Sequence, residues 1–174
     1  MAYSNHIIEQ LLQPYKAVIG KDFEKYRNHV CRVFLNCRMM DTNEEEKYAI
    51  AAVFHDIGIW TNHTIDYLSP SIAQAKQYLQ TAGKTEWTEE ITQMIFWHHK
   101  TGKYKGEYEQ TVETFRRGDW IDVSLGLLSY GLDRRILRNT RKQLPNRGFH
   151  LFLLKKVGKN FFRHPLHPLP MFKS

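Results

Sequence analysis

The chain has 174 residues, of which 42% are hydrophobic and 25% are charged. This length fits one domain with a substantial core, and the composition is typical of a folded protein and not of a disordered one. No apolar run approaches the roughly 20 residues that span a bilayer. The N-terminal segment MAYSNHIIEQLLQ lacks the basic start and unbroken apolar core of a secretion signal, so we expect a cytoplasmic protein.

The net charge of +7 is distributed unevenly along the chain. Residues 133–174 hold eleven Lys/Arg and one acid, a net charge of +10. Residues 1–132 hold fourteen Lys/Arg and seventeen acids, a net charge of −3. We therefore predict a main domain over residues 1–132 and a basic extension over residues 133–174 that packs on it.

Apolar residues recur at helical spacing along the chain. The first predicted helix carries an apolar stripe after Ser4, a candidate N-cap, and Pro14 kinks or ends it. A second helix follows Asp22. A third has Asn43 as its candidate cap and Gly58 at its end.

Three more helices are predicted farther along. Ser69-Pro70 opens one that runs towards Gly83, since proline at the first helical position loses no intrahelical hydrogen bond. Another starts near Thr88, and a sixth covers residues from about 109 to 129. No convincing run of β-branched residues alternates with a period of two. The sequence therefore predicts an all-α fold.

Several ionisable residues fall on the apolar faces of these predicted helices, where unpaired burial would cost several kcal/mol each. They come from four helices: His29, His55, Asp56, His98, His99 and Asp119. A shared cation would satisfy them together, since imidazole and carboxylate groups suit a divalent metal. The spacing therefore favours a metal site.

Each of these residues has an ordinary explanation when taken alone. His29 could be a hydrogen-bonded core histidine, and the pair His98-His99 could pack among aromatic residues. Asp119 and Asp122 could be solvated acids. Their combination in one chain favours a metal site over these separate explanations. A helical histidine comes first, His-Asp follows at a helix end, and a helical aspartate comes last.

The segments YRNHVCRVF, AAVFHDIGI and FRRGDWIDVSLG resemble the ordered H…HD…D motif of the HD-domain superfamily of metal-dependent phosphohydrolases. The resemblance covers about residues 20–130. It implies an all-helical, HD-like domain that binds a divalent ion (Mn, Mg, Co, Ni, Zn or Fe). It also implies the metal ligands, which would be His29, His55, Asp56 and Asp119. Asp122 lies on the same inward stripe and is the alternative last ligand.

The segment MIFWHHKTGKYKGEY resembles the double-histidine segment of two-metal members of this superfamily. Those members carry a further histidine before it, and Ser69 stands where their His-Pro would be. We therefore expect one ion per chain, with His98 and His99 near the substrate or in the outer shell.

The resemblance implies hydrolysis of a small phosphate ester or nucleotide by a metal-activated water. In that reaction Asp56 would hold the water, His98 or His99 would protonate the leaving oxygen, and Arg32 would clamp the phosphate. The motif predicts metal binding better than it predicts the reaction, because proteins with different activities share it. A di-iron oxygenase, a cyanamide hydratase-like hydro-lyase and a non-catalytic metal-binding regulatory module remain alternatives.

The segment FHLFLLKKVGKNFFR, residues 149–163, mixes apolar and basic residues. The ordinary reading is a terminal helix that packs its apolar side on the domain. The alternative is a basic amphipathic helix that contacts an anionic membrane surface or an acidic partner. A proline-rich tail follows. No recognised motif supports nucleic-acid binding, and the sequence predicts no oligomeric state.

Overall fold

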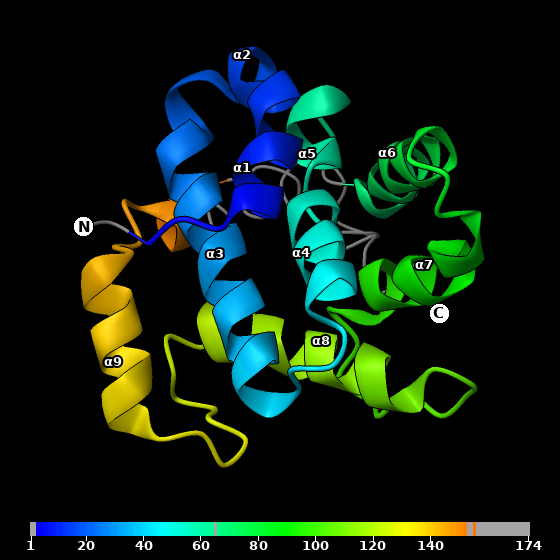
Figure 1. The fold of residues 1–174 in the computed structure, drawn as a ribbon. Helices are drawn as coiled ribbons and strands as arrows, with labels where there is room; N and C mark the ends of the chain where they lie inside the picture. The colour runs from blue at the N-terminus through cyan, green and yellow to red at the C-terminus, as the bar shows by residue number, and fades with distance from the viewer. Residues whose placement is uncertain (1–2, 65, 153–154, 156–174) are drawn as a thin grey trace, which may run out of the picture.

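The computed structural model describes residues 3–64, 66–152 and 155. In this part of the chain the protein is all-α, as predicted, and no strand is present (Figure 1). The helices in chain order are α1 (His6–Leu12), α2 (Lys16–Ile19), α3 (Phe23–Met40), α4 (Glu45–Phe54), α5 (Gly58–Thr61), α6 (Leu68–Thr81), α7 (Thr88–Trp97), α8 (Glu109–Val123) and α9 (Arg134–Gln143).

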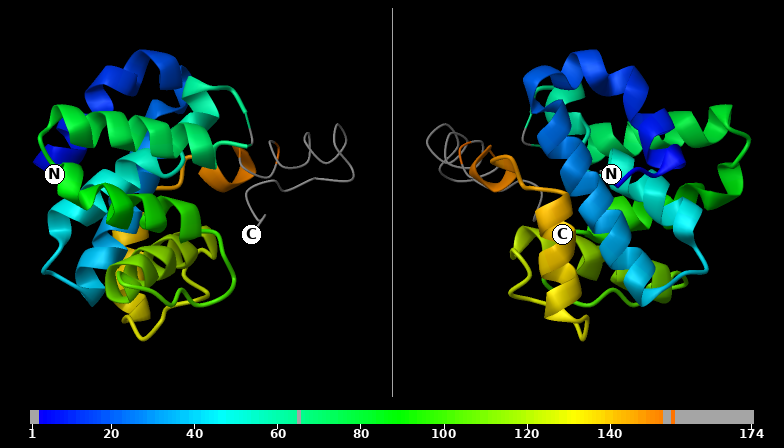
Figure 2. Two further views of the ribbon diagram at one scale, coloured as in Figure 1. Left: turned by 90° about the vertical axis from the view of Figure 1, so that its right-hand side faces the viewer. Right: turned by 60° about the vertical axis from the view of Figure 1, so that its left-hand side comes forward.

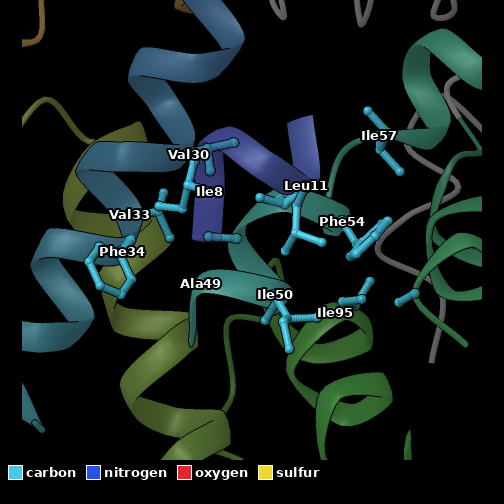
Figure 3. Packing of buried hydrophobic residues seen from close by; sticks show 14 of the residues in the cluster. Ile8, Leu11, Val30, Val33, Phe34, Ala49, Ile50, Phe54, Ile57 and Ile95 are labelled. Atoms are coloured by element: carbon cyan, nitrogen blue, oxygen red, sulfur yellow. The ribbon is translucent and has the colours of Figure 1, made fainter. Parts of the chain in front are cut away.

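The long helix α3 is the centre of the packing. It packs against α4 on one side and along α8 on another, while α7 packs against both α8 and α6. Apolar side chains from α1, α3, α4 and α7 interdigitate between these helices (Figure 3). Their burial supplies the main favourable free energy of folding and fixes the helices relative to one another. The residues predicted to bind metal lie on α3, just after α4 and on α8, while His98 and His99 follow α7.

Helices α3 and α8 lie close together at Gly118. A Cβ atom at this position would lie 2.5 Å from the Sγ atom of Cys37 and 3.2 Å from the carbonyl oxygen of Val33. Both contacts come from α3, so only glycine lets the two backbones meet at this distance. The next residue of α8 is Asp119, and the close approach therefore holds its carboxylate near α3.

We expect the substitution Gly118→Ala to destabilise the protein by about 1–3 kcal/mol, because the added methyl group overpacks the contact with Cys37. The higher helix propensity of alanine opposes this effect only in part. Gly102→Ala is the matched control, since a Cβ atom there would meet nothing within 4 Å. Urea unfolding of metal-free protein measures both changes, and equal stabilities for the two variants would contradict the close approach.

The starts of two helices differ from the predictions. Asn5, and not Ser4, caps α1: its side chain accepts a hydrogen bond from the backbone amide of Ile8. Helix α4 begins after Glu44 without any side-chain cap. The expected cap, Asn43, instead donates its backbone amide to the side chain of Asp41 in the preceding turn. Local hydrogen bonding in the turn has replaced capping of the helix.

Two helix ends also differ. Helix α4 stops at Phe54, and Gly58 begins the short helix α5 where we expected a helix end. Gly58 is required there because a Cβ atom would lie 2.5 Å from the Tyr67 carbonyl oxygen. Helix α8 stops at Val123, six residues before the predicted end at Ser129, since Leu125 and Gly126 adopt positive φ angles that break the helix.

Helix α9 was not predicted, because its sequence offers a single buried residue, Leu137, and hence no apolar stripe. Asp133 caps it by accepting a hydrogen bond from the amide of Arg135. The helix lies alongside α3 (Figures 1 and 2). Beyond it, Leu144 and Phe149 are buried in the core. Most of the predicted terminal helix 149–163 and the proline-rich tail lie outside the described residues.

Among the described residues, no helix is both long enough and apolar enough to cross a membrane.

Candidate metal centre

Four parts of the chain bring ionisable side chains to one buried point. His29 comes from the middle of α3, and Asp119 comes from α8. His55 and Asp56 occupy the turn between α4 and α5, and His98 caps the C-terminal end of α7. All five residues are at most 2% exposed. The residues that the sequence placed on separate apolar faces are therefore together in the folded protein.

The donor atoms of these residues have the spacing of ligands around one cation. The Nε2 atoms of His29 and His55 lie 3.0 Å apart. An Oδ atom of Asp56 lies 3.7 Å from the first of these nitrogens and 3.4 Å from the second. For Asp119 the corresponding distances are 3.6 and 3.8 Å. Metal–ligand bonds of about 2.0–2.2 Å place neighbouring ligand atoms about 3.0–3.6 Å apart. The observed distances of 3.0–3.8 Å are close to this range and are compatible with one shared ion.

The hydrogen bonds of the imidazole rings identify which ring nitrogen carries the proton. Nδ1 of His55 lies 2.8 Å from the carbonyl oxygen of Ala52, and Nδ1 of His98 lies 2.5 Å from that of Ile95. A carbonyl oxygen only accepts, so each Nδ1 donates its proton and leaves a lone pair on Nε2 when the ring is neutral. Outer hydrogen bonds of this kind orient metal-binding histidines in general.

His29 is oriented in the same way by a carboxylate. Its Nδ1 atom lies 2.7 Å from Asp122, whose two oxygens also accept hydrogen bonds from Arg32 at 2.6 and 2.9 Å. Burial alone would raise the pKa of Asp122, but Arg32 and then His29 lower it below its usual value, so the carboxylate is ionised. Asp122 therefore holds the outer side of His29, while Asp119 faces the Nε2 side.

Several polar atoms at this point have no hydrogen-bond partner. Among the described residues, buried atoms without a partner include Oδ1 of Asp56, Nε2 of His98 and Oδ1 of Asp119. Buried polar atoms are normally paired, and leaving them unpaired costs free energy. Together with the facing lone pairs of His29 and His55, they make a donor set that a cation would satisfy. The residues present thus fit a divalent metal ion.

A second group of donors adjoins the first. Donor atoms of His98, His99 and Asp119 lie within 4.8 Å of one another, and those of His55, Asp56 and His98 do likewise. Asp56 connects the groups, because Oδ2 faces His29 and His55 while Oδ1 lies 3.5 Å from Nε2 of His98. The expectation of one ion per chain remains a prediction.

Two contacts of this centre had not been predicted from the sequence. The hydroxyl group of Tyr67, which precedes α6, is hydrogen-bonded to His99. The ring of Phe149 stacks on His29 with 4.2 Å between ring centroids. Neither residue belongs to a recognisable spacing pattern, since each reaches the centre from a segment distant in the sequence. Phe149 places part of the basic extension directly against the candidate ligands.

Arg32 is buried on the outer side of the centre. Besides Asp122, its guanidinium donates to the carbonyl oxygen of Leu144 at 2.8 Å, and only 1% of the residue is exposed. The structure does not bring it to the Nε2 side of the histidines, where the donor atoms gather. A phosphate clamp at Arg32, as predicted, would require these bonds to break, so Arg32 orients Asp122 instead.

The buried groups differ in how readily they ionise. Burial raises the pKa of Asp119 to about 6, although His98 and His29 act to lower it. Burial lowers the pKa of His55 to about 3. Burial also favours protonation of Asp56, but His55 and His98 hold its pKa below the usual value. At neutral pH these charges give two carboxylates beside a neutral His55, which attract a cation.

Metal affinity should therefore depend on pH through Asp119. Below about pH 6 its carboxyl group is protonated in the metal-free protein, so each bound ion must displace a proton. We expect the apparent affinity to be constant above about pH 7 and to fall about tenfold per pH unit below about 6. Calorimetric titration with Mn²⁺ across this range measures it. An affinity that stays flat on acidification would contradict the assignment of Asp119 as a ligand.

Comparison of the chain with protein-family models, with curated proteins and with solved structures found no match.

Proposed function

We propose that the protein is a metal-dependent hydrolase that holds a divalent ion between His29, His55, Asp56 and Asp119. One observation carries the proposal: the Nε2 lone pairs of His29 and His55 face each other at 3.0 Å in a buried site, beside two carboxylates. Without a cation or a proton between them, these lone pairs repel. The neutral state of His55, whose pKa is about 3, favours the cation.

The proposed substrate class is a phosphate ester or nucleotide, which rests on the resemblance to the HD-domain superfamily. A divalent ion would lower the pKa of a water molecule and polarise a phosphoryl oxygen. The free Oδ1 atom of Asp56 is available to accept a hydrogen bond from the attacking water. His98 faces the same oxygen and is the proposed proton donor to the leaving group.

The protonation of His98 is consistent with this role. Burial alone would lower its pKa, but the nearby carboxylates of Asp56 and Asp119 raise it above the usual value. The raised pKa favours the protonated form of His98 in the metal-free protein. His99 lies beside it and has a lowered pKa, chiefly through burial and the charge of His98. We accordingly assign the acid role to His98 and a substrate-orienting role to His99.

The experiment has two parts. Elemental analysis of protein purified without added metal identifies the ion. A panel of phosphate esters and nucleotides is then assayed for phosphate release with Mn²⁺, Mg²⁺ or Co²⁺. The proposal expects metal-dependent release that chelation abolishes. A bound metal without turnover on the whole panel would instead support a regulatory metal-binding module.

A second candidate function is a di-iron oxygenase. The observation that favours it is the adjoining donor group of His98, His99 and Asp119, which with the connecting carboxylate of Asp56 could hold a second ion. Iron at about two ions per chain, with oxygen uptake and no phosphate release, would support the oxygenase over the hydrolase.

A further inference from the structure

The loop between α8 and α9 exposes a cluster of apolar side chains. Leu127 is 76% exposed, and Leu125, Leu128 and Tyr130 are 41–56% exposed. Single exposed leucines are common on protein surfaces, but several within six residues form a patch of the kind that marks an interaction site. Hydrogen bonds fix the loop: Ser124 accepts from the amides of Leu127 and Leu128. The leucines are thus presented outward by an ordered turn.

Helix α9 presents a basic face beside this loop. Five of its ten residues are basic: Arg134, Arg135, Arg138, Arg141 and Lys142. At 100° per residue these side chains fall within about 120° of one another around the helix axis. From Val123 to Phe152 there are six Lys/Arg residues and a single acid, Asp133. Arg141 pairs with Asp122 and Arg135 with Asp133, so Arg134, Arg138 and Lys142 give this surface its net positive charge.

The apolar loop and the basic helix form one surface. Arg134 donates to the carbonyl oxygen of Leu127 at 3.4 Å, and Arg141 donates to that of Ile121 at 3.0 Å. On the other side of the loop, the guanidinium of Arg117 lies 5.6 Å from the ring centroid of Tyr130. In Figures 1 and 2 the loop lies at the N-terminal end of α9. We call this surface, residues 124–142, the loop–α9 patch.

We propose that the loop–α9 patch docks the protein on an anionic lipid bilayer. Exposed leucines can enter the boundary between headgroups and acyl chains, while arginines and lysine bind lipid phosphates. A second copy of the chain fits less well, because a two-fold interface would bring the same positive charges together. Nucleic acid also fits less well, because Tyr130 is the single aromatic residue of the patch and leucines offer no surface for base stacking.

This surface differs from the segment that the sequence suggested for membrane contact. That segment, residues 149–163, lies mostly outside the described residues, whereas the loop–α9 patch is described in full. The patch adjoins the candidate metal centre, since Arg141 also binds Asp122, the outer partner of His29. Docking would therefore hold the centre near the membrane surface.

The test is co-sedimentation of the full chain with phosphatidylcholine vesicles, with and without phosphatidylglycerol. We expect binding only to the anionic vesicles and a decline with added salt. Leu127→Ser/Leu128→Ser and, separately, Arg138→Gln/Lys142→Gln should each weaken the partition coefficient about tenfold or more. Lys76→Gln/Lys105→Gln removes two exposed charges elsewhere and should bind as the wild type does.

A fluorescent probe provides the second measurement. In Leu127→Cys the new thiol is exposed, whereas Cys31 and Cys37 are fully buried, so an environment-sensitive dye labels position 127 selectively. A blue shift of its emission with anionic vesicles is expected. The proposal is overturned if the wild type ignores anionic vesicles, or if both patch variants bind them normally. It is also overturned if RNA binds and vesicles do not. The same holds if Leu127→Ser/Leu128→Ser converts a dimer into a monomer and leaves vesicle binding unchanged.

Discussion

The variant His55→Ala is expected to lose metal binding, and with it the stabilisation and the activity that depend on the metal. His55 contributes a donor atom to two of the overlapping groups at the centre, and its Nε2 atom lies 3.0 Å from that of His29. Removing even an outer partner of a metal ligand weakens affinity about 10–100-fold, so removal of a ligand should weaken it more than about 100-fold.

Unfolding experiments measure this loss independently of any substrate. A metal ion that binds only the folded wild type raises its free energy of unfolding by about 2.7 kcal/mol when the free metal concentration is 100 times the Kd. His55→Ala should show no such increase at the same concentration. His6→Ala, which replaces an exposed histidine on α1, is the control and should retain the full increase. An equal stabilisation of His55→Ala and wild type would exclude His55 as a ligand.

The second prediction concerns Asp122, which we assign as a positioning residue and not as a ligand. In Asp122→Asn the buried guanidinium of Arg32 loses its charged partner, and breaking a buried ion pair costs about 3–5 kcal/mol of stability. His29 also loses the carboxylate that orients its ring, so metal affinity should fall about 10–100-fold. Asp66→Asn on the exposed surface is the control, with a change within about 0.5 kcal/mol.

A double variant separates the two effects of Asp122. Arg32→Met/Asp122→Asn removes the unpaired charge and should recover much of the lost stability, because the buried positive charge is gone. It should not recover the metal affinity, since His29 still lacks its anionic partner. Unfolding of metal-free protein and metal titration measure these quantities separately. Recovery of both together would mean that Asp122 acts only through general stability.

The sequence predicted much of the centre, because metal ligands on helices lie on the same apolar stripes as core residues. His29, His55, Asp56 and Asp119 were all placed inward on this ground, and all are buried at one point. The choice between Asp119 and Asp122 could not be made from spacing. The two aspartates lie three residues apart on one helix face, and only the contacts of Arg32 and His29 separate their roles.

Other parts of the structure were beyond prediction for physical reasons. Contacts made by Tyr67 and Phe149 depend on how distant segments fold back on the centre, and neither residue type indicates such a contact. Helix α9 has one buried residue, so hydrophobic periodicity could not show it. The burial of Arg32 depends on Asp122 and on the Leu144 carbonyl group, which come from two other segments.

The central claim is that one cation lies between α3, α8 and the turn after α4. Anomalous X-ray diffraction from crystals grown with Mn²⁺ measures this directly. The account predicts a peak about 2.0–2.2 Å from Nε2 of His29, Nε2 of His55 and carboxylate oxygens of Asp56 and Asp119. Crystals that bind Mn²⁺ elsewhere, with these four side chains paired to one another and no peak between them, would contradict it.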